Sequence, residues 1–87
     1  MQILYKTITA DTQVHVGECY FVGATVSHTG STMMTVYDED ASTATAARKL
    51  MQLNGTDVTI MLPLPGVKCT GIYVDWNAGV GTVYYYL

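Results

Sequence analysis

The chain has 87 residues, a net charge of −3 and only 13% charged residues, against 49% hydrophobic ones. This length allows one domain, which we place over residues 1–87, and four basic residues are too few to neutralise the phosphates of a nucleic acid. The sequence begins without a basic region and long apolar run, and charged or polar residues interrupt every apolar stretch. We therefore expect no signal peptide, no membrane span and no nucleic-acid partner.

The composition predicts a protein that is completed by other proteins. Average globular chains are about 25% charged, so Thr, Ser, Asn and Gln must form much of this surface, and the chain has thirteen Thr. A domain this small has few interior positions, and the sequence offers more apolar side chains than those positions can hold. We expect the excess to be covered at a protein–protein interface.

Short runs of alternating apolar and polar residues recur about every 8–12 positions, and no amphipathic helix interrupts them. In chain order the pattern predicts eight strands, at 2–9, 13–16, 18–27, 32–37, 49–53, 56–62, 67–76 and 80–87. This pattern predicts an all-β fold, a single small β-sandwich of about eight antiparallel strands with a jelly-roll-like arrangement. A small barrel is the alternative.

The stretch Lys49–Leu62 (KLMQLNGTDVTIML) predicts a hairpin. Asn54-Gly55 is the strongest short-range signal for a two-residue type I′ turn, in which both central residues have positive φ. That turn would place Leu53 opposite Thr56 and Met51 opposite Val58. One face of the hairpin would then carry the apolar residues Met51, Leu53, Val58, Ile60 and Leu62.

The strand at 18–27 is apolar on both faces near its start, which is typical of a central strand. Its Cys19 lies fifty positions before Cys69, and neither belongs to a CxxC pair or has metal-ligand spacing. We expect both to be buried thiols that pack as small hydrophobes. A disulfide between them is the alternative, because both lie on strands that could be neighbours across the core.

No motif predicts catalysis, a metal or a cofactor. The acidic triplet Asp38-Glu39-Asp40 lies between strands, but a calcium site needs about six to eight oxygen ligands, so a solvated loop is the simpler interpretation and cation binding stays open. His15 and His28 have no nucleophile at a spacing that requires pairing, and Ser27 next to His28 would point to the opposite face of a strand. We expect a protein that is not an enzyme.

The aromatic residues suggest two kinds of contact. Tyr73 and Trp76 could stack on a sugar ring if both are exposed. On the last strand Tyr84 and Tyr86 face one way and Tyr85 the other, so both faces are large and need cover. The residues expected at an oligomer or capsid interface are Met1, Ile3, Tyr5, Tyr84, Tyr85, Tyr86 and Leu87.

A Gly/Ala strand at Phe21–Val26, followed by a Val-Tyr-Asp strand end at Val36–Asp38, begins an order of strands and turns that resembles that of small virion structural proteins of tailed bacteriophages. The resemblance covers roughly residues 20–87, and a longer, more acidic loop at 38–47 departs from it. It is carried by a Gly/Ala strand, a Val-Tyr-Asp strand end, a small-residue loop, a hairpin, a Gly-Ile-Tyr-Val strand and a Val/Tyr-rich last strand, here Phe21–Val26, Val36–Asp38, Ala41–Ala44, Lys49–Leu62, Gly71–Val74 and Val80–Tyr86.

The resemblance implies a non-enzymatic capsid decoration (cement) protein. Its partners would be the major capsid protein and further copies of itself, for example in a trimer around a local symmetry axis. It would lie on the capsid surface of the virion after synthesis in the host cytoplasm. The alternative is a receptor- or carbohydrate-binding module of a head fibre or tail, and the choice between head and tail stays open.

Overall fold

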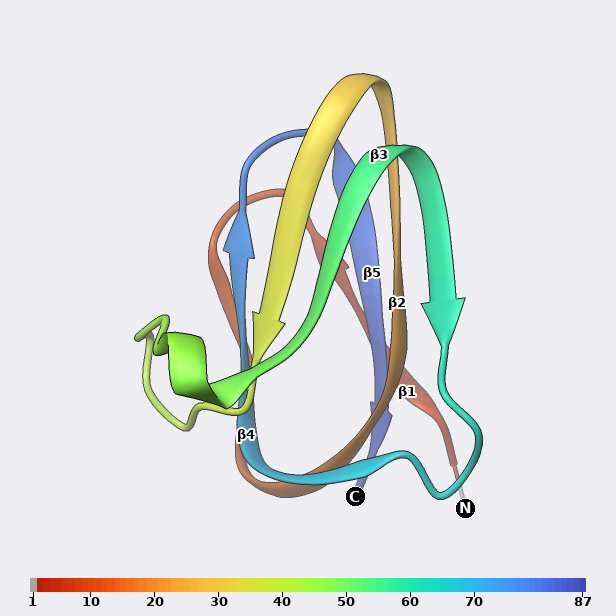
Figure 1. The fold of residues 1–87 in the computed structure, drawn as a ribbon. Helices are drawn as coiled ribbons and strands as arrows, with labels where there is room; N and C mark the ends of the chain where they lie inside the picture. The colour runs from red at the N-terminus through yellow and green to blue at the C-terminus, as the bar shows by residue number, and fades with distance from the viewer. Residues whose placement is uncertain (1) are drawn as a thin grey trace.

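The computed structural model describes residues 2–87, and the side chains of all of these except residues 31 and 32. The described chain is all-β and antiparallel, as predicted (Figure 1). Its elements are β1 (Leu4–Ile8), β2 (Thr12–Tyr37), the 3-10 turn η1 (Ala46–Arg48), β3 (Lys49–Met61), β4 (Val67–Trp76) and β5 (Val80–Tyr86). The order within the one sheet is β1-β5-β2-β3, and β4 also pairs with β2. No helix within residues 2–87 has the length and hydropathy needed to cross a bilayer.

Strand β2 is the centre of this sheet. It runs for 26 residues and pairs with β3, β4 and β5 along different parts of its length. The three separate strands predicted at 13–16, 18–27 and 32–37 are successive parts of β2, and the predicted breaks between them are irregularities in pairing, at 16–19 with β4 and at 27–32 with β3. Figure 1 shows β2 turning at the bottom and again at the top of the molecule. The described chain has five strands and not the predicted eight, because β2 and β3 bend at positions where the sequence predicted turns between separate strands.

The predicted hairpin at Asn54-Gly55 is wrong. Strand β3 continues through these residues and pairs along its length with β2, so that Leu53 lies opposite Met34 and Val58 opposite Val26. Gly55 has a φ of 130°, but no non-glycine residue within the described chain has a positive φ, so Asn54 cannot form a type I′ turn. Either a hairpin or a bent strand at Asn54-Gly55 would explain why the apolar residues lie at odd positions before it and at even positions after it. The tertiary pairing decides between them.

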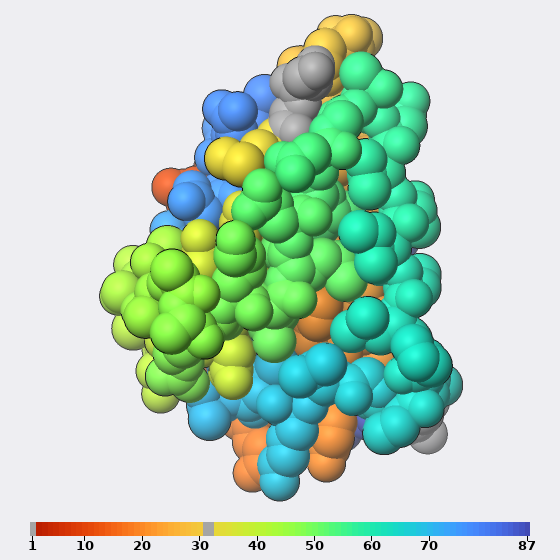
Figure 2. All heavy atoms as spheres, in the orientation of Figure 1, coloured from red at the N-terminus to blue at the C-terminus, as the bar shows by residue number. Residues whose placement is uncertain are grey.

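The predicted apolar face of 49–62 is correct despite the wrong turn. Met51 and Leu53 are buried, and Val58, Ile60 and Leu62 pack against the core. Figure 2 shows the β3 segment lying over the front of the molecule. The core beneath combines residues from all five strands, chiefly Ile8, Phe21, Val26, Met34, Val36, Leu53, Ile72, Val74 and Val83.

Replacing Leu53 with Ala tests this packing, because Leu53 is fully buried where β3 pairs with β2. Losing its side chain should lower the free energy of unfolding by about 2–5 kcal/mol. Leu64→Ala is the matched control, because Leu64 is 59% exposed in the loop after β3. Its effect should stay within about 0.5 kcal/mol, as measured by urea denaturation. Equal losses for the two variants would contradict the assigned core.

Candidate functional site

Strands β1 and β5 bring the two ends of the chain together. They pair antiparallel, with Tyr5 opposite Tyr84. On its other side Tyr84 lies opposite Gly23 of β2, which in turn lies opposite Met61 of β3. A Cβ atom on Gly23 would lie 2.5 Å from Met61 Sδ, so the Met61 side chain crosses the space that this glycine leaves open. One row of the sheet therefore carries two tyrosines and a methionine across four strands.

A second pair of tyrosines lies on the same side of the sheet, in a neighbouring row. Tyr20 of β2 lies opposite Tyr86 of β5, and their rings stack with centroids 4.8 Å apart and an interplanar angle of 7°. The Tyr86 hydroxyl donates a hydrogen bond of 2.6 Å to the carbonyl oxygen of Pro65. We call the surface formed by Tyr5, Tyr20, Met61, Tyr84 and Tyr86 the tyrosine face. Its members are half-buried or exposed, and Tyr5 is 70% exposed.

The tyrosine face lies on the side of the sheet that points away from the core. The residues that alternate with it along the strands, such as Phe21 and Val83, are fully buried. The next row on the same side is formed by threonine from four neighbouring strands, namely Thr7, Thr82, Thr25 and Thr59. The Tyr5–Tyr84–Met61 row and the threonine row contain no charged residue, whereas Lys68 of β4 lies opposite Tyr20 and borders the face on that side. This region has the composition of the centre of a protein interface, where Tyr and Met are enriched and charges are depleted.

The structure brings together most of the residues predicted at an interface. Ile3 and Leu87 are exposed and lie just outside β1 and β5, the paired strands that carry Tyr5, Tyr84 and Tyr86, whereas Met1 lies outside the described residues. Tyr85 faces the other way, as predicted: it packs against the core, and its ring centroid is 5.6 Å from that of His15. Tyr20 and Met61 were not predicted, because only strand register shows that they share a face with Tyr84.

The structure gives Tyr73 and Trp76 no shared exposed platform. Tyr73 is 9% exposed, and burial together with the nearby Asp11 and Asp75 charges raises the pKa of its hydroxyl. Trp76 is half-buried, and its indole Nε1 donates a 3.0 Å hydrogen bond to the carbonyl oxygen of Gly79. A sugar would need both rings open to solvent, so this arrangement does not favour stacking.

The acidic loop is held by an arginine. Arg48 Nη1 lies 3.3 Å from Glu39 Oε1, and the Glu39 side chain is only 8% exposed. Arg48 Nη2 lies 3.7 Å from Asp38 Oδ1 and donates a 2.9 Å hydrogen bond to Thr70 Oγ1. The backbone N–H of Thr70 donates to Asp38 Oδ1 at 2.8 Å. These bonds fix the loop to β4, and no group of three or more His, Cys, Asp or Glu in the described part of the chain could hold a metal ion.

The loop lies directly on β4 because Gly71 has no side chain. A Cβ atom there would lie 2.5 Å from the carbonyl oxygen of Glu39 and 2.7 Å from Asp40 Cα. From the neighbouring strand β2, the Gln13 side-chain amide donates hydrogen bonds to the carbonyl oxygens of Glu39 and Ile72, at 2.9 and 3.0 Å. The acidic triplet is thus part of the packed structure, and its charges are partly neutralised by Arg48.

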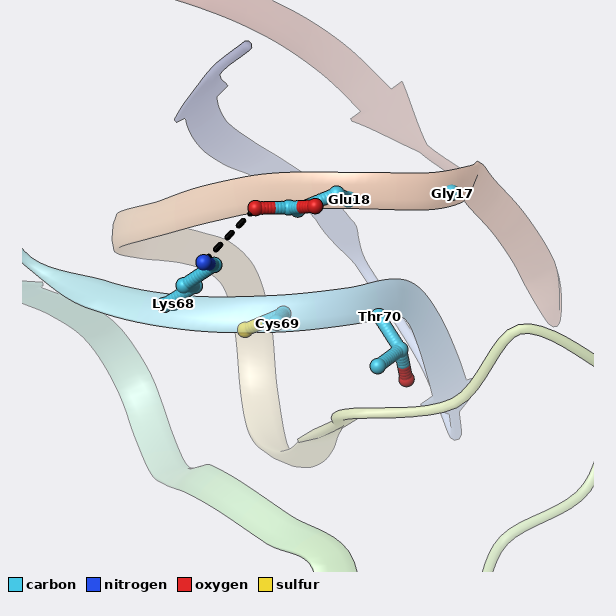
Figure 3. Close-up of a pocket in the computed structure, with 5 residues that line it drawn as sticks. All are labelled: Gly17, Glu18, Lys68, Cys69 and Thr70. Carbon is cyan, nitrogen blue, oxygen red and sulfur yellow. Dashed lines mark ion pairs between the residues drawn. The ribbon is translucent and has the colours of Figure 1, made fainter.

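The two cysteines lie directly opposite each other on β2 and β4. Both are buried free thiols, as predicted. Burial, and to a lesser extent the Asp38 charge, raises the pKa of Cys19 to about 11 and that of Cys69 to about 12. Cys69 also helps to line an open pocket of about 500 Å³, together with Gly17, Glu18, Lys68 and Thr70. Figure 3 shows the Lys68–Glu18 ion pair, at 2.7 Å, bridging the two strands beside Cys69.

The Arg48→Met variant tests the role of the arginine. It would leave the Glu39 carboxylate nearly buried without a cation, which should lower the free energy of unfolding by about 1–2 kcal/mol, below the usual loss for a buried pair because Arg48 is 42% exposed. Lys49→Met is the control, because Lys49 is exposed and its Nζ donates a 3.1 Å hydrogen bond to Gln52 Oε1. Its effect in the same urea denaturation should stay within about 0.5 kcal/mol. Indistinguishable variants would show that the arginine does not hold the loop.

The raised pKa values predict the pH dependence of thiol alkylation. The thiolate is the reactive form, and in the unfolded chain its fraction saturates above the ordinary pKa of 9.0. In the folded chain the iodoacetamide rate should be lower at pH 8 and should keep rising past pH 9, because both thiols stay protonated up to about pH 11. Rates measured with and without denaturant check this. Identical pH profiles would contradict burial of the pair.

Comparison of the chain with protein-family models, with curated proteins and with solved structures found no match.

Proposed function

We propose that this chain is a non-enzymatic structural protein of a tailed-phage virion, a capsid decoration (cement) protein that binds the major capsid protein as a homo-oligomer. In this proposal the sheet packs as a jelly-roll-like sandwich, and the protein lies on the capsid surface after synthesis in the host cytoplasm. The single observation that carries the contact role is the tyrosine face, whose own five residues carry no charge. The virion assignment is supported by the resemblance of strand and turn order over residues 20–87.

The tyrosine face supports a contact role because of its chemistry. An antiparallel sheet with one solvated face normally alternates apolar residues inward with polar residues outward. Here the outward positions include four tyrosines and Met61, and Met61 is 51% exposed. Tyrosine suits a protein contact, since a partner can bury its apolar ring while its hydroxyl stays hydrogen-bonded. The Tyr20–Tyr86 stack and the Tyr86 bond to Pro65 hold part of the face in place before binding.

The contact is made by the face of the sheet and not by strand addition at the β1 edge. Lys6 lies opposite Val83, so it occupies a core-side position on this edge strand, yet it remains exposed. An inward-pointing lysine on an edge strand opposes pairing with another chain, because the pairing would bury its charge. The partner therefore covers Tyr5 and Tyr84 from outside the sheet. The alternative of a carbohydrate-binding module gains no support, since Tyr73 is buried.

Tyr5→Glu tests self-association. The wild-type chain should sediment as an oligomer at tens of micromolar, and a carboxylate in the contact should weaken association at least about tenfold, because it would be buried without a partner. Val16→Glu is the control, because Val16 is 65% exposed where β2 pairs with β4, away from the tyrosine face. A wild-type monomer, or equal effects of both variants in analytical ultracentrifugation, would count against the proposal.

The virion assignment has its own test. Particles purified on a density gradient from a culture that expresses the gene should contain this chain, and the Tyr5→Glu chain should be depleted from them relative to Val16→Glu. Mass spectrometry of the particle fraction measures both amounts. Absence of the wild-type chain from the particles would overturn the virion role. It would not affect the proposal of self-association, which the sedimentation experiment tests separately.

A further inference from the structure

The positions of Cys19 and Cys69 satisfy the first requirement of a disulfide. The two residues are directly opposed on antiparallel strands, and the pairing continues regularly through Tyr20 with Lys68 and Phe21 with Val67. Directly opposed residues in such a pair have Cα atoms about 4.5–5.5 Å apart and side chains on the same face. A disulfide needs a Cα separation of about 4.4–6.8 Å. The two strands therefore need not move for the sulfurs to join.

We propose that Cys19 and Cys69 form a reversible redox pair, which is reduced in a reducing compartment and closes to an intrachain disulfide when a small disulfide oxidant is present. This inference goes beyond the proposed function and does not depend on it. Both thiols are free in the structure, and each is at most 2% exposed. Burial shields the pair from other protein thiols, so the intrachain reaction is favoured over cross-linking between chains.

Cys69 helps to line the pocket beside the ion pair (Figure 3), and Cys19 is not among the residues that line it. Because Cys69 is only 2% exposed, an oxidant in this pocket reaches its thiol when the β2–β4 pair opens locally. The Cys69 thiol loses its proton, and the thiolate attacks one sulfur of oxidised glutathione, forming a mixed disulfide and releasing one glutathione thiol. The deprotonated Cys19 then attacks Cys69 Sγ and releases the second glutathione thiol. In total two protein thiols are oxidised and one molecule of oxidised glutathione is reduced to two of the thiol form.

The disulfide would join β2 to β4 at residues fifty positions apart in the sequence. A cross-link over such a long loop limits the unfolded chain strongly, so the oxidised protein should be more resistant to unfolding. A chain made in a reducing cytosol would keep the reduced state, because reducing compartments maintain thiols. Release into an oxidising medium would then stabilise the β2–β4 pair.

The test uses the full folded chain, incubated with oxidised glutathione and then alkylated. We expect mass spectrometry to show a monomer lighter by two hydrogens, and a non-reducing peptide map to join Cys19 to Cys69. The melting temperature should rise by more than about 10 °C and return on addition of dithiothreitol. In Cys19→Ala the oxidant should leave a mixed disulfide on Cys69 and raise the melting temperature by no comparable amount.

Three results would overturn the proposal. Both thiols could stay reduced in the folded chain under conditions that oxidise the unfolded chain. The product could consist mainly of cross-linked dimers. Alternatively, the intrachain disulfide could lower the melting temperature, which would mean that the two strands had to be displaced to form it. The wild-type readouts decide each case even if Cys19→Ala folds poorly.

Discussion

The rest of the structure depends on the pairing of β2 with three other strands. Its first part binds β4, its middle lies between β5 and β3, and its last part returns to β3 and β4. Because β4 pairs with both ends of β2, the bends in β2 place Phe21 and Val36 in one core. A strand with partners on both sides has most of its backbone groups paired, and this suits its position in the middle of the fold.

The same bends divide the surface into two regions of different chemistry. Where β2 pairs with β4, charged groups gather: Arg48 binds Asp38 and Glu39, and Lys68 binds Glu18. Where β2 pairs with β5, the outward rows hold chiefly tyrosine and threonine, and Lys68, which lies opposite Tyr20, marks the border with the charged region. A protein with few charged residues thus uses most of its ion pairs to fix the acidic loop and the β2–β4 pair. The β2–β5 region has none of these ion pairs and is suited to a partner, whose binding would in turn stabilise a small domain.

The tyrosine face and the cysteine pair have one cause in common. Tyr5 and Tyr84 lie at opposite ends of the sequence, and Cys19 and Cys69 are fifty positions apart, yet each pair is directly opposed in the sheet. Long-range register produces both. The tyrosine pair lies on a surface that a partner protein could bury, and the cysteine pair is buried where a disulfide could link the two strands. Neither arrangement requires an unusual motif, which is why neither has a sequence signature.

The sequence by itself determined the all-β class, the central strand at 18–27, the burial of both cysteines and the apolar face of 49–62. The class and the apolar face follow from the alternation of side chains, the central strand from apolar residues on both of its faces, and the burial of the cysteines from their apolar character; all of these are local properties. Contacts between distant segments were needed to show that Asn54-Gly55 bends β3 and makes no hairpin, that three predicted strands are one, and that Tyr20 and Met61 share a face with Tyr84. Bends and turns both interrupt the alternation of a strand, and only contacts between distant segments determine which of the two forms.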